Sequence, residues 1–300
     1  MRLNNTLLPA YVNLVASLQN EEPSAVLARV EGQIRDGALD LADVFVTLDP
    51  MGALITGILR IARMGKDAAH LTQWRGREGG GTRRAIADLV LEARARAEEL
   101  GIRELSTRVY DSRMTEAYSD ALQDAGFALT NRRVEYRTPL SQMGHEGATS
   151  LAWKTMADTG EGVVLDVLRQ ASIGTPDGVD TSRGSAAIEN LLDGSYADMD
   201  PRAVQIGYSG GQAVAILFCL VDTGTGWSTI AFMGLVPSHR GRGLGTQTHL
   251  HGIETLRALG GVTYHDGTSE SNDTMRHLFE KQGCVESDRM EEWHAAPRQA

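Results

Sequence analysis

The sequence has few cysteines, no long apolar run and no excess of basic residues. Its two cysteines, Cys219 and Cys284, are too few for a disulfide framework, and such thiols fit a reducing cytoplasm. No apolar run approaches the roughly 18–20 residues that cross a bilayer. The N-terminal segment does not read as a signal peptide, because Pro9, Asn13 and Ser17 interrupt its apolar residues. We therefore expect a cytoplasmic protein that does not span a membrane.

The charge of the chain is acidic and unevenly distributed. Of the net charge of −10, residues 1–145 contribute −1 and residues 146–300 contribute −9. Acidity promotes solubility, and it also produces a field that attracts cationic substrates. Nucleic-acid binding normally requires a basic face, so a nucleic-acid partner is not expected.

Two segments, residues 121–136 and 278–293, resemble each other at a spacing of 157 residues. The matched pairs are Gly126 with Gly283, Arg132 with Arg289, Glu135 with Glu292, and Tyr136 with Trp293. In each segment a glycine ends a helix and a strand follows. The order of elements ahead of each segment is also shared, which indicates two copies of one structural unit.

The boundary between the copies is expected in a segment rich in Pro, Gly and Ser without hydrophobic periodicity. We therefore predict a first domain at 1–140, a linker at 141–149 and a second domain at 150–300.

Hydrophobic patterns predict the individual elements. Strands are expected at 42–49, 53–63, 150–156, 203–210, 212–222, 227–237, 261–266 and 288–294, and helices at 7–19, 25–37, 87–101, 162–173, 186–194 and 248–260. Short glycine-containing turns separate three consecutive strands, which favours an antiparallel meander. The fold class is therefore α/β with a mixed, α+β type of sheet.

The most informative stretch runs from Leu235 to Gly245, between a strand and a helix. Its three glycines, at 241, 243 and 245, allow a sharp turn and expose backbone N–H groups at a helix N-terminus. Such a turn suits a pyrophosphate, to which Arg240 and Arg242 could add charged hydrogen bonds. The spacing is not the G-x-G-x-x-G of dinucleotide-binding folds, and the Lys of a Walker loop is absent.

The segment Arg240–Gly245 matches [QR]-x-x-G-x-[GA] at every fixed position, and Val236–Gly245 reads V-P-x-x-R-G-x-G-L-G. Downstream, Asn272 opens a helix that ends at Leu278–Cys284, L-F-E-K-Q-G-C. With these motifs, residues of about 150–296 resemble the GNAT acetyltransferase superfamily.

The resemblance implies two GNAT-like domains, each a mostly antiparallel twisted sheet flanked by helices, and acetyl-CoA as cofactor. It implies that two strands splay apart beyond the glycine loop and that exposed backbone groups pair with the pantetheine arm. The implied cofactor-binding residues are Met233, Leu235, Val236, Arg240, Gly241, Arg242, Gly243, Leu244, Gly245, Asn272 and Phe279. Asn272 could equally be a helix N-cap.

The sequence departs from the family at the positions of the catalytic general acid and general base. Phe279 stands where many members have the Tyr that protonates the leaving thiolate, and Phe has no proton to donate. Residues 227–235 contain no carboxylate or imidazole to act as base. The catalytic candidates are therefore His265, Asp266 and Glu270, with Tyr264 as a possible acid that points away from His265. No metal is expected.

The corresponding loop of the first half, 73–81, is interrupted by Glu78 and is interpreted as degenerate. We expect transfer of an acetyl group to a small-molecule or peptide amine, with a cationic acceptor favoured by the acidic second half. The alternatives are a non-catalytic acyl-CoA-binding regulatory module and acyl transfer to another acceptor or of a longer chain. Loops at 158–200 should line the acceptor site, and they contain Asp177, Asp180, Asp193, Asp198 and Asp200. The oligomeric state is not predicted.

Overall fold

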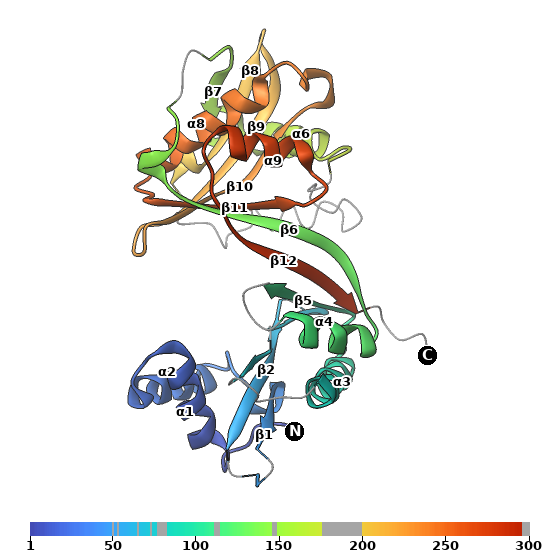
Figure 1. Ribbon diagram of the computed structural model, residues 1–300. Coiled ribbons are helices and arrows are strands. Elements are labelled where there is room, and N and C mark those ends of the chain that lie inside the picture. Colours follow the sequence, from blue (N-terminus) through green and yellow to red (C-terminus); the bar gives the residue numbers. More distant parts are fainter. Residues whose placement is uncertain are drawn as a thin grey trace. The chain divides into compact units, whose positions relative to one another are not determined.

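The structure is a computed structural model that describes residues 1–49, 51–52, 54–64, 66–72, 74–76, 83–110, 115–145, 149–175 and 200–295. The chain divides into two compact units (Figure 1). The first unit comprises Met1–Arg132 together with Arg289–Ala300, and the second unit comprises Arg133–Asp288. Within the described ranges, no helix is long and apolar enough to traverse a bilayer.

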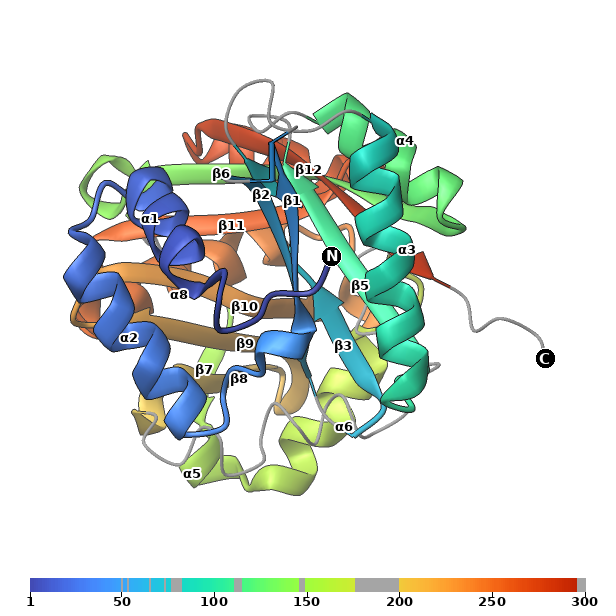
Figure 2. The same ribbon diagram turned by 90° about the horizontal axis from the view of Figure 1, so that it is seen from below.

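The first unit is a sheet with helices on both faces. Its elements are α1 (Leu8–Gln19), α2 (Pro23–Arg35), η1 (Leu41–Asp43), β1 (Val44–Leu48), β2 (Ile55–Arg63), β3 (Ala68–Leu71), β4 (Arg75–Gly76), α3 (Arg83–Glu99), β5 (Glu104–Tyr110) and α4 (Thr115–Asp124). Strands β1, β2 and β3 are antiparallel neighbours, β5 is parallel to β3, and β4 pairs with β2. Along β1, Val44 and Val46 pack under α1 and α2, while Phe45 packs on the other side under α3 and α4 (Figure 2).

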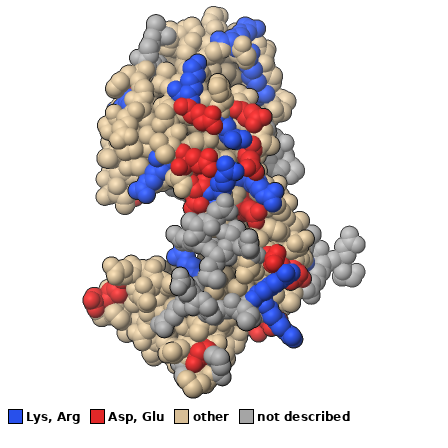
Figure 3. Space-filling view, viewed as in Figure 1, with Lys and Arg blue, Asp and Glu red and all other residues tan. Residues whose placement is uncertain are grey.

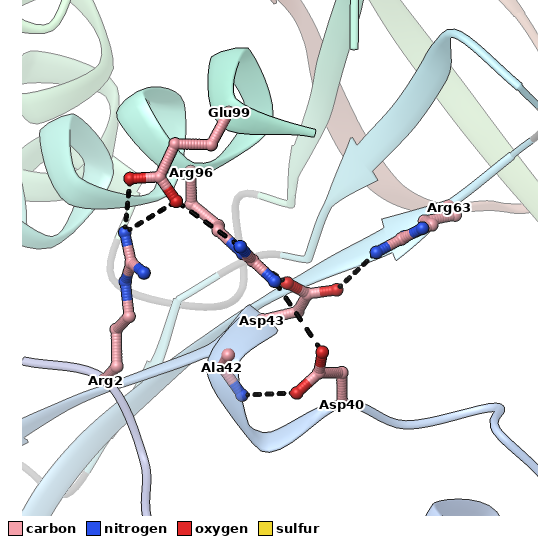
Figure 4. A network of polar contacts seen from close by, with 7 residues as sticks. All are labelled: Arg2, Asp40, Ala42, Asp43, Arg63, Arg96 and Glu99. Carbon is pink, nitrogen blue, oxygen red and sulfur yellow. Dashed lines mark hydrogen bonds and ion pairs between the residues drawn. The ribbon is translucent and has the colours of Figure 1, made fainter. Parts of the chain in front are cut away.

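A polar network joins the start of the chain to α3 in the first unit (Figure 4). At its centre, Arg96 donates to the buried carboxylate of Asp43 at 2.9 Å. The outer members are Arg2, Asp40, Arg63 and Glu99. Because Asp43 is only 4% exposed, the charges of Arg96 and Arg63 compensate a carboxylate that would otherwise be costly to bury.

The second unit is a longer sheet whose helices and strands follow the same order as in the first, apart from one extra strand in each unit. Its elements are η2 (Leu140–Gln142), β7 (Ala152–Thr155), α5 (Met156–Thr159), α6 (Glu161–Ala171), η5 (Pro201–Ala203), β8 (Val204–Ser209), β9 (Gln212–Asp222), β10 (Trp227–Leu235), η6 (Pro237–His239), α8 (Leu244–Ala258), β11 (Thr263–Ser269) and α9 (Asp273–Lys281). Strands β7 to β10 form an antiparallel meander, as the short turns predicted. One core lies under α6, and a second core lies under α8 and α9.

Two long strands, β6 (Phe127–Pro139) and β12 (Glu286–Ala295), contribute to both units. In the second unit, residues 133–139 of β6 pair with β11, and the Arg137 N–H donates to the Val285 carbonyl at 2.9 Å. In the first unit, residues 290–295 of β12 pair with β5, and the Thr130 hydroxyl donates to the Glu292 carbonyl at 3.0 Å. Each half of the sequence therefore supplies a strand to the sheet of the other half.

This exchange makes the compact units differ from the contiguous ranges 1–140 and 150–300 that the sequence suggested. The repeat itself has a structural counterpart, because Gly126 and Gly283 end α4 and α9 with φ angles of 79° and 80°. Similarity between segments identifies equivalent strands, but it does not specify the neighbour with which each strand pairs.

The sequence predicted most helices and strands to within a few residues. It missed the short strand β3 and strand β5, and α8 begins at Leu244, four residues before the expected start. Strand β11 continues to Ser269, so His265 and Asp266 lie within the strand rather than at its end. The helix expected at 186–194 lies outside the described residues.

Candidate functional site

The seam between β10 and β11 opens after two residue pairs. These parallel strands pair only at Trp227–Thr263 and Ser228–Tyr264, although β10 continues to Leu235. A bulge in β10 between Ile230 and Phe232 interrupts its register with β9 just beyond that point. The structure thus contains the splayed strands that the resemblance implied.

Backbone directions along β10 show which groups line this gap. The Val236 N–H donates to the Val214 carbonyl at 2.9 Å, and the Val236 carbonyl accepts from the His239 N–H at 3.0 Å. Because backbone groups alternate between the two edges of a strand, Met233 and Leu235 direct theirs toward the gap. The resemblance implied that Val236 presents backbone groups there as well, but both of its groups are bonded within the unit.

The glycine loop forms the entrance to α8. Gly241 and Gly243 have φ angles of 72° and 76°, which L residues with side chains rarely adopt. Gly243 is the N-cap of α8 and provides no side-chain cap, while Leu244 anchors the first turn in the core under α6. The first-turn N–H groups, which include that of Gly245, have no acceptors within the helix. Such a terminus favours an anion.

Arg240 has a structural role that the sequence did not reveal. Its guanidinium donates to the carbonyls of Leu235, Ala171 and Ile173 at 3.0, 2.8 and 2.8 Å. It therefore fixes the loop to the end of α6 and also occupies the carbonyl of Leu235. Arg242 is exposed beside the loop, so it is better placed than Arg240 to reach a phosphate.

At the start of α9, Asn272 acts as an N-cap, because its side chain accepts the Met275 N–H at 3.2 Å. This is the structural role that the sequence left open, and a bond from Asn272 to pantetheine stays a prediction. Phe279 is 1% exposed and packs against Tyr136, His249 and Tyr264 with ring-centroid distances of 4.8, 5.5 and 6.4 Å. It therefore belongs to the core under α9.

The catalytic candidates separate onto the two faces of β11. His265 lies 6.2 Å from the Trp227 ring and opposite Arg137 in register. Burial and the charge of Arg137 lower the pKa of His265, which favours its neutral form. Tyr264 and Asp266 share the other face, as the alternation predicted. Glu270 follows the strand, and its carbonyl accepts from Arg276 at 3.2 Å.

A buried hydrogen-bond chain links α8 to β11. The Tyr264 hydroxyl donates to Asp266 at 2.6 Å and lies 3.1 Å from His249 Nε2. Loss of hydration raises the pKa of Asp266 to about 7, while burial lowers the pKa of His249 to about 4. The sequence did not single out His249, because a histidine within an amphipathic helix carries no signal of what it faces.

Most of the acidic loop that was expected to line the acceptor site lies outside the described residues. Asp177, Asp180, Asp193 and Asp198 lie outside the described residues. Asp200 bonds Arg202 at 2.7 Å, and this contact lowers the pKa of Asp200 to about 2. On the face shown in Figure 3, acidic and basic side chains are intermixed over the region of α9. Among the described residues, no cluster of His, Cys, Asp and Glu could hold a metal ion.

In the first unit the equivalent seam is closed. All four residues of β3 pair with β5, from Ala68–Glu104 to Leu71–Thr107. Trp74 then lies buried over Gly57, and Arg75–Gly76 returns to pair with β2. The remainder of the expected loop, Gln73 and residues 77–81, lies outside the described residues.

The structure therefore consists of two α/β units of one design, and the second unit has splayed strands and a glycine loop. A GCN5-related N-acetyltransferase from Sphaerobacter thermophilus has this fold, with a TM-score of 0.68 and 12% identity over 100% of this chain and 95% of its own. A tandem GNAT protein from the clavulanic acid biosynthesis pathway gives 0.58 and 16% over 86% and 83%. A GCN5-related N-acetyltransferase from Kribbella flavida gives 0.54 and 12% over 82% and 88%.

Residues 180–284 match the model of the acetyltransferase (GNAT) family. The matched segment lies within the second half of the chain, which is therefore similar to the GNAT family in sequence and fold. No curated protein matches the sequence.

Proposed function

We propose that the protein transfers an acetyl group from acetyl-CoA to an amine, and that the second unit performs this reaction. The observation that carries the proposal is the coincidence of an open seam between β10 and β11 with a glycine loop at the end of β10. An extended ligand with a pyrophosphate at one end fits such a gap, because the helix terminus receives the anion and the strand edge pairs with the arm.

The residues present suit acetyl-CoA, which would supply the activated acetyl thioester. The first-turn amides of α8 and the Arg242 side chain would hold the pyrophosphate. Backbone groups of Met233 and the N–H of Leu235 would orient the arm, while Arg240 holds the loop in shape through its three carbonyl bonds. Orientation of this kind supplies much of the rate enhancement in acyl transfer.

His265 would accept the proton of the attacking amine. Its lowered pKa leaves the imidazole neutral at pH 7, so it can take a proton. We expect His265→Ala to reduce turnover by about 10²-fold or more and to leave CoA affinity unchanged. In the wild type, the rate should fall as the pH drops below the pKa of His265, and the variant should lack this limb. Full turnover with an unchanged pH profile would direct attention to Asp266 and Glu270.

Calorimetry and a transfer assay test the proposal together. Titration should show one CoA bound per chain, and incubation with acetyl-CoA and a panel of amines should yield an acetylated amine and free CoA. Two equal sites would contradict the degenerate state of the first unit. If the protein did not bind CoA at all, this result would contradict the proposed function.

One observation favours a second candidate, a non-catalytic acyl-CoA-binding module. Phe279 is buried at the place of the usual acid, and β10 contributes no titratable side chain as a base. The same assay separates the candidates, because a binding module would hold CoA without producing an acetylated amine. We also propose a cytoplasmic location, which fits the two free, buried cysteines.

A further inference from the structure

The hydrogen-bond chain between α8 and β11 leads from the sealed core of the second unit to a residue that solvent reaches. His249 and Tyr264 are both 0% exposed, whereas Asp266 keeps part of its surface exposed. Because side chains alternate along a strand, Tyr264 and Asp266 share the face of β11 that packs under α8 and α9, and His265 projects from the other face. The base role proposed for His265 leaves this chain without a task.

Asp266 is the first residue on its face of β11 after the strands of the seam separate. Tyr264, which pairs with Ser228, is the last residue of β11 in register with β10. Asp266 follows two residues later, and its only strand neighbour in the described part of the sheet is Tyr136 of β6. The edge of β11 toward β10 is therefore open at Asp266, which places this residue at the narrow end of the gap.

The hydrogen atoms of the chain point toward Asp266. Tyr264 has one hydroxyl hydrogen and donates it to Asp266 Oδ2 at 2.6 Å, so the contact of 3.1 Å with His249 must use a hydrogen on Nε2. In agreement, His249 Nδ1 has no hydrogen-bond partner among the described residues. The Gly267 N–H donates to Asp266 Oδ1 at 2.8 Å.

These directions determine where a proton on Asp266 can lie. Each carboxyl oxygen already accepts one hydrogen bond, from Tyr264 or from Gly267. A proton bound to Asp266 must occupy a lone pair that neither donor uses, where it is available for transfer. After the proton has left, the two donors stabilise the carboxylate that remains.

The titratable side chains that pack around this carboxyl are neutral at pH 7. Burial lowers the pKa of His249 on α8 to about 4. Burial also raises the pKa of the neighbouring phenols and thiols, which lie on β6, β11 and β9 and after α9. They are Tyr136, Tyr264, Cys219 and Cys284.

The charged neighbours of Asp266 oppose each other. On β6, Arg133 lowers the pKa of Asp266 and Glu135 raises it. On α9, Arg276 acts on Tyr136 through a hydrogen bond. Loss of hydration is the largest influence, and it raises the pKa of Asp266 to about 7. Such a carboxyl holds a proton in about half of the molecules at neutral pH and releases it readily, as a general acid must.

The chain also lies beside the position of the acid that the resemblance implied. Phe279 occupies that position, and its ring centroid lies 6.4 Å from that of Tyr264 and 5.5 Å from that of His249. In this protein an aromatic hydroxyl is therefore supplied from β11 instead of α9, and it is bonded to a carboxyl at the gap.

We propose that Asp266 is the general acid of the second unit and protonates the sulfur of coenzyme A as the acetyl group leaves it; this inference rests on the proposed function. In this step, His265 removes a proton from the amine as its nitrogen bonds to the acetyl carbon. Asp266 gives its proton to sulfur as the C–S bond breaks and sulfur keeps the electron pair. His265 then releases a proton to water and Asp266 takes one up. Tyr264 and His249 are positioning residues that hold the carboxyl and stabilise its anion.

An infrared titration tests this acid without turnover. In the difference between the wild type and Asp266→Asn, the carbonyl band of a protonated carboxyl should be present at pH 5 and should disappear as the pH rises through about 7. CoA should shift this band, whereas adenosine 3′,5′-bisphosphate, which lacks the pantetheine arm, should not. A band that CoA leaves in place, although calorimetry shows CoA bound, would overturn the proposal. If calorimetry shows no CoA bound, the proposed function itself is contradicted, and the assignment of the acid is lost with it.

Profiles of rate against pH test the direction of proton transfer. An acid must be protonated to act, so wild-type turnover should fall as the pH rises above the pKa of Asp266. Asp266→Asn should lower turnover by about 10²-fold or more, lose this alkaline limb and bind CoA normally. Tyr264→Phe removes a donor that lowers the pKa of Asp266, so the alkaline limb should move to higher pH.

A matched control and a second variant keep this test decisive. Asp222→Asn, at the end of β9, should change neither turnover nor the profile. Melting temperatures identify a variant that fails to fold, and in that case Tyr264→Phe and the infrared titration of the wild type with CoA still decide. Full turnover in folded Asp266→Asn, or an alkaline limb that Tyr264→Phe leaves in place, would overturn the proposal.

Discussion

The seam between two parallel strands has the same place in the fold of both units, but it is closed in the first unit and open in the second. In the first unit, β3 is short and pairs with β5 along its whole length. In the second, β10 pairs with β11 for two residues and then continues alone to Leu235. A splayed seam is therefore not an automatic result of this fold, since the same topology also accommodates a closed one.

The segments that follow the two strands explain the difference. After β3, the indole of Trp74 packs over Gly57 and the chain returns to β2. After β10, the chain passes through glycines with positive φ and Arg240 ties it to the end of α6. A large buried side chain follows the closed seam, whereas a glycine loop held by Arg240 follows the open one.

The two units nevertheless depend on each other's strands. Tyr136, from the first half, is buried in the core of the second unit, and its repeat equivalent Trp293 is buried in the core of the first. The first half is therefore needed for the second unit even where its own seam is closed.

Removal of the exchanged strand should have the largest effect. A fragment of residues 150–288 lacks β6, so β11 has an open edge and the core under α9 loses Val134 and Tyr136. A fragment of residues 127–288 keeps the whole strand. We expect cooperative urea unfolding for the longer fragment and none for the shorter, measured by circular dichroism. Equal stability of the two fragments would show that the exchange is not needed.

Gly243→Asp should weaken CoA binding by at least about tenfold, or about 1.4 kcal/mol. The change places a carboxylate at the N-cap of α8, where the pyrophosphate is expected, and it strains a residue with a φ angle of 76°. Calorimetry measures the affinity. Gly76→Asp in the first unit serves as the matched control and should leave CoA affinity unchanged. Normal affinity in folded Gly243→Asp would place the phosphates elsewhere.

Asp266→Asn should alter the pH dependence of stability. The folded-state pKa of about 7 lies above the ordinary 3.8, so the folded protein holds a proton that the unfolded chain releases. Stability from this group is complete below about pH 4 and is lost as the pH rises through 7. The variant should lack that loss. His249 titrates in both proteins, so its contribution to the pH dependence of stability cancels in the comparison.

Urea unfolding of wild type and variant at pH 5 and pH 8 measures this difference. Asp222→Asn is the control, because hydrogen bonds from Thr225 and Gly224 lower the pKa of Asp222 and its titration falls below this range. Parallel profiles for wild type and Asp266→Asn would show that Asp266 is charged throughout.

Phe279→Tyr should have the smallest effect on activity, within about tenfold of the wild type, since a general acid contributes its roughly 10²–10⁴-fold only in a site built around it. Phe279 is enclosed by Tyr136, His249 and Tyr264, so an added hydroxyl would meet the core. Turnover and melting temperature should be measured together, because a modest loss of stability is expected. A large gain in turnover would indicate that the ring lies next to the leaving thiolate.

Local features of the fold were predictable from the sequence, and distant ones were not. The glycines that end α4 and α9, the meander and the anion loop each depend on a few neighbouring residues, so short patterns reveal them. The bonds of Arg240 to Ala171 and Ile173 join segments nearly 70 residues apart, and no local pattern encodes them. For the same reason, the sequence does not reveal the hydrogen-bond chain from His249 to Asp266 or the register that places Glu135 opposite Gly267.

The exchange of strands also fixes an order of events during synthesis. In the first unit, β12 occupies the position between β5 and β6, so this position stays empty until residues 286–295 are made. At about 5–20 residues per second, the roughly 160 residues after Arg132 take on the order of ten to thirty seconds to translate. During that interval the edge of β5 and the core into which Trp293 packs are exposed. A nascent chain of this protein should therefore be a client of chaperones that shield open sheet edges, and a stalled ribosome should leave the first unit incomplete.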